Sequence, residues 1–313
     1  MRNAVFAGAG PLSGTGRPGF VAPVLLVTVG TLLAFSVLLS RVAADAGLPM
    51  LTYLAAALTG AGAILAAVAG MRGRFAGARR WLIYSAGAGV FMSVPSAMGY
   101  LSVAKVGAGY VSLTFAFPVL LTWVIAVALG LERMRWSAAA GVAAGLAGGL
   151  LLAAGKVGTG ADGAPLAWTL LASAIPLVLA LGNIYRTQFW PSDAGALPLA
   201  ALTLLAGGLM TLPVATAVEG WDAVTTLATH WPIILTASAV IAGQMGLQFR
   251  LQDCAGPVYM SQIGSVASVV GATLAVHWFG ERLPSGFWGA AILIALGAAA
   301  FHKARMAALR DMA

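Results

Sequence analysis

Two glutamines four residues apart interrupt an apolar stretch late in the chain. Gln244 and Gln248 lie within residues 231–251, and residues spaced by four share one face of a helix. A side-chain amide both donates and accepts hydrogen bonds, so the pair suits a neutral or zwitterionic small molecule better than a bare ion. The alternative interpretation is a hydrogen-bonded contact between two helices.

A second group of polar side chains follows directly along the chain. Gln262 and Ser265 are three residues apart and share a helical face, and Tyr259 lies one turn before Gln262. Together with Gln244 and Gln248, this group is our prediction for the centre of a substrate-binding site.

Further polar residues stand inside apolar stretches, where they are costly unless they face a bundle interior or an aqueous cavity. Pro118 removes the backbone donor that would pair with the carbonyl of Thr114. That carbonyl either faces substrate or is met by a neighbouring hydroxyl. Serine hydroxyls beside Pro95 either line a cavity or bond to the backbone carbonyl that the proline frees. Asn183 is either a cavity donor or a clasp between helices. The additional candidates for substrate contact are Ser93, Tyr100, Thr114 and Asn183.

Two glutamates, Glu132 and Glu281, each follow an apolar stretch and precede an arginine, Arg133 or Arg282. One interpretation is a carboxylate that couples transport to protons or gates it. The other is a structural corner, in which the glutamate pairs with an arginine or caps a helix N-terminus, where negative charge is favoured. No Asp or Glu lies at the middle of an apolar stretch, so a buried carboxylate relay is not expected.

Catalytic chemistry has little support in the residue inventory. The chain has three His and one Cys, and it has no HExxH or comparable cluster. We predict no catalytic residue, no metal site, no cofactor and no enzymatic activity. Two alternatives stay open: a membrane enzyme that acts on lipid-linked substrates, and a membrane scaffold that transports nothing.

The elements that position these residues are membrane-spanning helices. Hydrophobic residues make up 60% of the 313 positions and charged residues 8%, whereas about a quarter of an ordinary soluble protein is charged. We predict an all-α integral membrane protein with ten transmembrane helices. The predicted spans are 21–40, 48–70, 81–101, 107–130, 136–155, 166–188, 197–218, 231–251, 256–279 and 286–303.

Lysines and arginines predict the orientation of these spans. With the N-terminus inside, thirteen of the 17 Lys and Arg residues fall in cytoplasmic segments, as the positive-inside rule requires. We therefore expect a multi-pass protein of the inner (plasma) membrane with both termini cytoplasmic. The net charge of +8 follows from the same bias, and no nucleic-acid partner is expected.

The two halves of the chain share a layout. Tyr110 and Tyr259, Glu132 and Glu281, and Gly148 and Gly297 are each 149 positions apart. Five spans per half is an odd number, so the second half must be inverted relative to the first. Inverted halves are typical of secondary transporters, in which they enclose a central site. Within the first half, glycines at intervals of four predict close helix packing: Gly141, Gly145 and Gly149.

The chain resembles the drug/metabolite transporter superfamily, specifically the ten-helix EamA-type permeases. The resemblance is carried by Phe115-Ala116-Phe117-Pro118 to Leu131-Glu132-Arg133, and by a second copy from Gly256-Pro257-Val258-Tyr259 to Gly280-Glu281-Arg282-Leu283. One departure is that Ala267 stands where the first copy has Pro118. The resemblance implies efflux or uptake of small metabolites through a cavity between the halves.

We therefore expect a secondary transporter, and an exporter in particular, that moves a small organic metabolite across the lipid bilayer as a monomer or homodimer. The expected organisation is a flexible cytoplasmic tail at 1–20 without a cleaved signal peptide, an EamA-like five-helix repeat at 21–155, a second at 166–303, and a cytoplasmic tail at 304–313.

The ten-span topology makes a direct prediction. Reporter fusions placed after Ala313 and within residues 219–229 should report opposite sides of the membrane, because an odd number of spans separates them. Alkaline phosphatase and fluorescent-protein fusions measure this. The same side for both fusions would contradict the topology.

Overall fold

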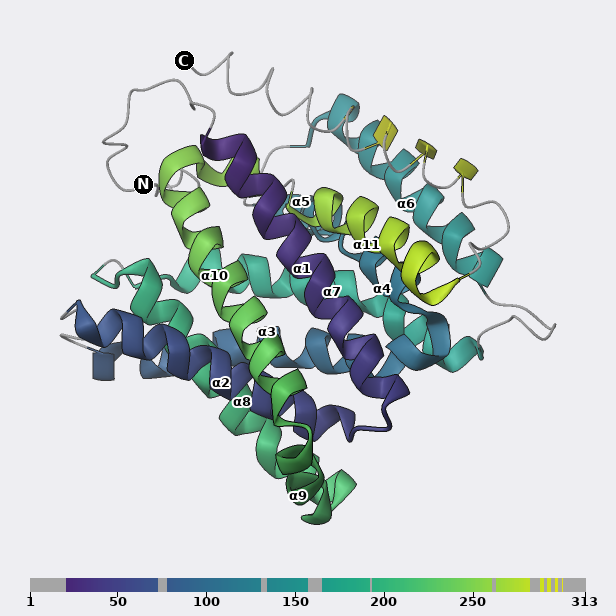
Figure 1. The fold of residues 1–313 in the computed structure, drawn as a ribbon. Helices are drawn as coiled ribbons and strands as arrows, with labels where there is room; N and C mark the ends of the chain where they lie inside the picture. Colours follow the sequence, from purple (N-terminus) through teal and green to yellow (C-terminus); the bar gives the residue numbers. More distant parts are fainter. Residues whose placement is uncertain are drawn as a thin grey trace.

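The computed structural model describes residues 21–72, 78–130, 134–156, 165–191, 193–260 and 263–281, together with 288–289, 292–293, 296–297 and 300. Every regular element within these residues is a helix (Figure 1). The helices are α1 (Val21–Asp45), α2 (Met50–Met71), α3 (Ala78–Val106), α4 (Ala108–Thr114), α5 (Pro118–Ala128), α6 (Trp136–Lys156), α7 (Leu166–Phe189), α8 (Ala196–Glu219), α9 (Asp222–Thr229), α10 (Trp231–Met260) and α11 (Ile263–Phe279).

The helices have the length and apolar character of membrane spans. Among the described residues, six spans are long and apolar enough to cross a bilayer, with α4 and α5 taken as one of them. A seventh is added if α9 and the first part of α10, bent by 86°, form one span. Two shorter apolar helices cover Trp136–Leu151 and Ile263–Phe279. These helices confirm the prediction of a helical membrane protein. A helix suits lipid because it satisfies its own backbone hydrogen bonds where lipid offers none.

The predicted span 107–130 consists of two helices. α4 ends at Thr114 and α5 begins at Pro118. Since proline cannot donate, the amide of Phe117 instead donates to the carbonyl of Thr114 at 3.2 Å. The carbonyl freed by Pro118 is therefore satisfied by local backbone, and neither interpretation suggested by the sequence describes it.

One other predicted boundary is wrong, and a segment between two predicted spans contains a short helix. The segment between the predicted spans 231–251 and 256–279 is not a loop, because α10 continues as helix to Met260. Charged residues at a membrane edge need not end a helix, since the helical backbone pairs with itself in water and in lipid alike. The segment 219–229 contains the short helix α9. Most of the predicted tenth span, 286–303, lies outside the described residues.

The packing of the helices has a centre. α2 and α8 pack side by side, α2 also packs on α10, and α8 also packs on α3. Around this centre α1 packs on α10 and α11, whereas α7 packs on α3 and α5. α6 lies at the edge of the bundle beside the described residues of 288–300 (Figure 1).

Glycines allow the closest approaches in this packing. A side-chain carbon on Gly297 would lie 2.5 Å from the carbonyl oxygen of Gly141 and would also clash with Gly145. A side-chain carbon on Gly149 would lie 2.8 Å from the ring of Phe117. The predicted role of the glycine repeat in close packing is therefore confirmed.

The contact between α2 and α8 can be tested at Gly208. A side-chain carbon there would lie 2.7 Å from the amide nitrogen of Thr59 and 2.9 Å from the carbonyl oxygen of Ala55. Gly208→Ala must push the two helices apart, and we expect it to destabilise the protein by about 1–3 kcal/mol. Thermal unfolding of the purified protein in detergent measures the loss.

Gly70→Ala is the matched control, because Gly70 is also helical but a side-chain carbon there meets no atom within 4 Å. We expect its unfolding temperature to equal or exceed that of the wild type. Equal unfolding temperatures for both variants would show that the helices are not in contact at Gly208.

Candidate functional site

The amide pair on α10 lies inside the bundle. Gln244 is buried, and its Nε2 donates to Oε1 of the partly buried Gln248 at 2.9 Å. The two side chains therefore share a helical face, as the spacing predicted. An amide has two N–H donors and two acceptor lone pairs, so one mutual bond leaves most of the capacity of each group for another partner.

A tyrosine pair lies in the same hydrophobic cluster as the helix turn that carries Gln244. Tyr53 of α2 and Tyr100 of α3 have ring centroids 5.7 Å apart, and both side chains are buried together with Ile241 and Met245 of α10. The hydroxyl of Tyr53 has no hydrogen-bond partner within the described part of the chain. A buried phenol normally finds one, so this hydroxyl can serve a bound molecule.

Other predicted site residues have local partners. Ser93 donates to the carbonyl of Val90 at 3.5 Å, and Thr114 donates to that of Val111 at 2.7 Å. Both hydroxyls are buried and bond to their own helix. The carbonyl that Pro95 frees is that of Phe91, so Ser93 bonds to a different carbonyl from the one that the sequence interpretation named. Ser265 lies on the exposed face of α11.

Asn183 forms the interhelical clasp that the sequence suggested as one alternative. Its Nδ2 donates to Oγ1 of Thr122 on α5 at 3.2 Å, and its Oδ1 accepts from Nη2 of Arg186 at 2.5 Å. The amide therefore links α7 to α5 and also orients a guanidinium. The side chain of Tyr259, and Gln262 and Glu132 as a whole, lie outside the described residues, so their predicted roles stay predictions.

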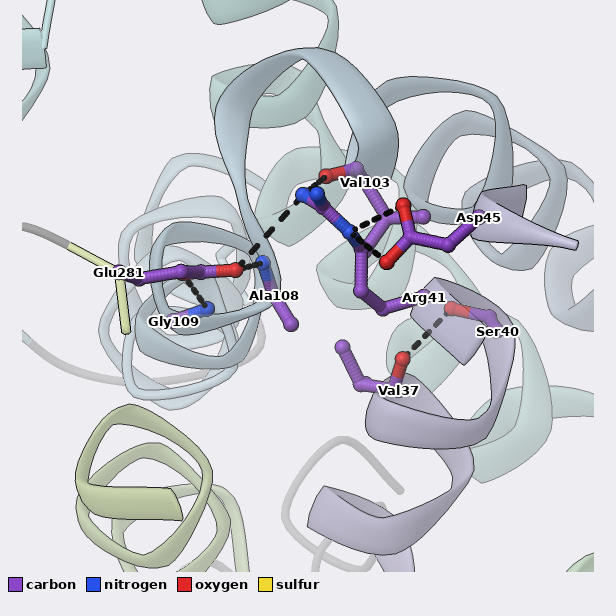
Figure 2. A network of polar contacts seen from close by, with 8 residues as sticks. All are labelled: Val37, Ser40, Arg41, Asp45, Val103, Ala108, Gly109 and Glu281. Atoms are coloured by element: carbon purple, nitrogen blue, oxygen red, sulfur yellow. Dashed lines mark hydrogen bonds and ion pairs between the residues drawn. The ribbon is translucent and has the colours of Figure 1, made fainter. Parts of the chain in front are cut away.

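Glu281 lies at the centre of a polar network at one end of the bundle (Figure 2). Its Oε1 accepts from the amide of Ala108 at 2.7 Å, and its Oε2 accepts from the amide of Gly109 at 2.9 Å. These amides belong to the first turn of α4, whose orphan donors attract a carboxylate. Gly107 precedes them with φ of 89°, a conformation that glycine adopts without strain.

Arg41 connects this carboxylate to α1 and α3. Its Nη1 lies 3.9 Å from Oε1 of Glu281, and its Nε lies 2.9 Å from Oδ2 of Asp45. Nη1 also donates to the carbonyl of Val103 at 3.4 Å. The structural-corner interpretation therefore describes the contacts of Glu281, with Arg41 and the first turn of α4 as its described partners. Arg282 lies outside the described residues.

A second carboxylate, Glu219, makes a similar cap at the same end of the bundle. At the end of α8, it accepts from the amides of Leu51 and Thr52 in the first turn of α2, at 2.9 and 2.8 Å. The hydroxyl of Thr52 adds a third bond at 2.6 Å. Sequence reasoning missed Glu219, Arg41 and Tyr53. The available signal for Glu219 and Arg41 was their position at the end of a predicted span. Charged residues without a specific role are also common at span ends, so this position alone does not identify them.

One hollow lies away from the amide pair and the tyrosine pair. A groove of about 370 Å³ lies between α5 and α6. Its lining is apolar and includes Trp123, Val127, Met134 and Leu146. It offers no polar group to a solute. Among the described residues, no three His, Cys, Asp or Glu side chains converge as metal ligands would.

The cap on α4 can be tested by Glu281→Gln. The amide retains one acceptor oxygen, but its NH₂ group then opposes a backbone donor of α4. A hydrogen bond to a charged group contributes about 1.5–3 kcal/mol, and we expect a loss of that size in thermal unfolding in detergent, with reduced expression. The control is Asp45→Asn, because the Asp45 side chain is 46% exposed and an exposed ion pair contributes about 0–1 kcal/mol.

A Glu281→Gln variant with normal expression and stability, but with a shifted pH dependence of transport, would contradict the structural role. It would identify Glu281 as a coupling residue.

The comparisons with known proteins support the fold alone. No protein-family model matches the sequence, and no curated protein matches it either. One solved crystal structure is similar over 93% of this chain and 99% of its own, with a TM-score of 0.57 and 19% sequence identity. At that identity the similarity extends to the arrangement of helices along nearly the whole chain, and it carries no function with it.

Proposed function

We propose that the chain is a secondary transporter of the EamA type, which moves a small organic metabolite across the plasma membrane by alternating access between two inverted halves. The observation that carries this proposal is the pattern of helix packing. In this proposal both termini lie in the cytoplasm, and the direction of transport is export.

The packing supports two related halves, because several helix–helix contacts each have an equivalent contact between the corresponding helices of the opposite halves. The sequence offset of 149 pairs α1 with α7, α2 with α8, α3 with α10 and α5 with α11. When each helix is replaced by its counterpart, the α1–α10 contact corresponds to the α7–α3 contact, α1–α11 to α7–α5, and α2–α10 to α8–α3. All of these contacts are present. The central α2–α8 contact exchanges with itself. A two-fold axis in the membrane plane produces such pairs of equivalent contacts.

The two ends of the bundle differ in how the halves are joined. At the outer end, in the orientation that the charges indicate, Glu281 and Glu219 of the second half hold α4 and α2 of the first, with donor–acceptor distances of 2.6–2.9 Å. At the inner end, Trp81 donates to Asp193 at 3.2 Å, and the hydroxyl of Tyr185 donates to the carbonyl of Tyr84 at 3.4 Å.

Shorter bonds to carboxylates are the stronger ones. Among the described residues, the hydrogen bonds between the halves are therefore shorter and stronger at the outer end than at the inner end, which fits a transporter that faces the cytoplasm. Alternating access requires the inner contacts to tighten as the outer ones separate.

The polar interior supplies the binding groups. Gln244 and Gln248 provide amide donors and acceptors, and the buried hydroxyl of Tyr53 has no hydrogen-bond partner in the described part of the chain. In an apolar bundle these groups stabilise a solute that brings its own hydrogen-bonding atoms. Gln262 and Tyr259, which follow along the chain, complete the proposed site.

The proposal predicts flux that depends on the amide pair. Proteoliposomes that contain the purified chain should accumulate at least one labelled compound from a panel of amino acids, nucleosides and small amines. Gln244→Leu combined with Gln248→Leu should reduce that flux about tenfold or more, since an unmet hydrogen bond costs about 1–3 kcal/mol. Uptake of radiolabel against protein-free liposomes measures it.

Gln188→Leu is the matched control, because Gln188 is a glutamine of α7 on the exposed surface. Its flux should equal that of the wild type. If monodisperse wild-type protein transports no compound of the panel, this result would argue against a transporter. If the double variant transports normally, the proposed function would stand, but Gln244 and Gln248 would not be its binding site.

A further inference from the structure

Within the described part of the chain, one arginine of a membrane span forms no ion pair with an acidic side chain. Arg186 lies in the last turn of α7 and is partly buried. Its Nη2 donates to Oδ1 of Asn183 at 2.5 Å. Within the described part of the chain it forms no ion pair, whereas Arg41, also partly buried, has both Asp45 and Glu281 within 4 Å.

The surroundings of Arg186 hold the guanidinium in place without neutralising it. Asn183 is itself fixed, because its Nδ2 donates to Thr122, whose hydroxyl donates to the carbonyl of Pro118 at 2.6 Å. The residue directly before Arg186, Tyr185, stacks on Tyr84 of α3 with ring centroids 5.8 Å apart. Asn183 is therefore a neutral polar neighbour of the guanidinium, and the adjoining residue joins α7 to α3 through an aromatic contact.

The described acid nearest in sequence is already engaged. Asp193 follows α7 by four residues, and its Oδ1 accepts from Nε1 of Trp81 at 3.2 Å. It makes no ion pair with Arg186 within 4 Å. The acidic residue on the adjoining segment therefore serves a different contact between α3 and the end of α7.

A guanidinium keeps its charge under all physiological conditions and has five N–H donors, of which Asn183 uses one. A charged side chain at membrane depth is costly unless an anion or water meets it. The planar fork of donors matches the two oxygens of a carboxylate or phosphate. From these contacts we infer that Arg186, oriented by Asn183, binds an oxyanion at the inner end of α7.

The inference rests on the proposed function and narrows its substrate class to small molecules with a carboxylate or phosphate group, zwitterions included. The same chemistry is offered by a phospholipid head group from the inner leaflet. The binding chemistry is shared, and the source of the oxyanion is decided by experiment.

The first arm uses free anions and no membrane. Wild-type protein in an uncharged detergent is titrated with inorganic phosphate and with acetate, against chloride at equal ionic strength, and the unfolding temperature is recorded. We expect a saturable rise with phosphate or acetate. In Arg186→Gln the half-saturating concentration should increase about tenfold or more, as loss of a charged hydrogen-bond donor implies. Arg186→Lys should retain part of the affinity as a point charge.

Arg250→Gln is the matched control, since Arg250 is an exposed arginine that the charge bias places at the same membrane side. Its titration should match the wild type. Because Arg186→Lys keeps the charge, it keeps the test decisive if Arg186→Gln does not yield folded protein: a lysine variant with unchanged half-saturation for both anions would overturn the bidentate contact.

The second arm uses lipid. Protein from nanodiscs of mixed phosphatidylglycerol and phosphatidylcholine is analysed by native mass spectrometry. If phosphate and acetate have no effect but the wild type retains more phosphatidylglycerol than Arg186→Gln, the head group is the oxyanion. If neither free anions nor phosphatidylglycerol distinguish folded Arg186→Gln from wild type, the inference is overturned. Neither arm measures flux, so its failure would leave the transport proposal standing.

Discussion

The structure depends on one constraint: within a bilayer, each polar group must find its partner inside the protein. Water cannot satisfy an orphan donor there, and an unsatisfied group costs several kcal/mol. The constraint explains why every described element is a helix. It also explains why buried hydroxyls such as Ser40 and Thr211 donate to carbonyls of their own helix, each at 2.7 Å.

The same constraint makes the helix ends informative. The first turns of α2 and α4 have amides with no helical acceptor, and Glu219 and Glu281 reach them from the ends of other helices. Each cap therefore fixes where one helix of the second half ends relative to the start of one helix of the first. These carboxylates join the first and second halves of the chain at one end of the bundle, where the proposed alternating access requires the two to separate.

Apolar packing adds the second requirement. Helices in lipid gain little from burying apolar side chains, so close contact depends on small residues that let backbones approach. Gly208 at the α2–α8 contact and Gly297 against α6 act in this way. Among the described residues, the buried hydroxyls of Tyr53, Ser85 and Ser112 have no hydrogen-bond partner. Of the less satisfied groups, the hydroxyl of Tyr53 and the guanidinium of Arg186 are those on which the proposals draw.

The sequence by itself determined that this is a helical membrane protein, because the length and apolar character of a segment decide whether it is stable in lipid without reference to its neighbours. It also placed Gln244 and Gln248 on one face, since helical periodicity is a local property. Only the tertiary structure decided the partners of Glu281, Glu219 and Arg41, which come from segments as many as 173 residues away. Local patterns do not specify which helix ends meet, because that depends on how the whole bundle packs.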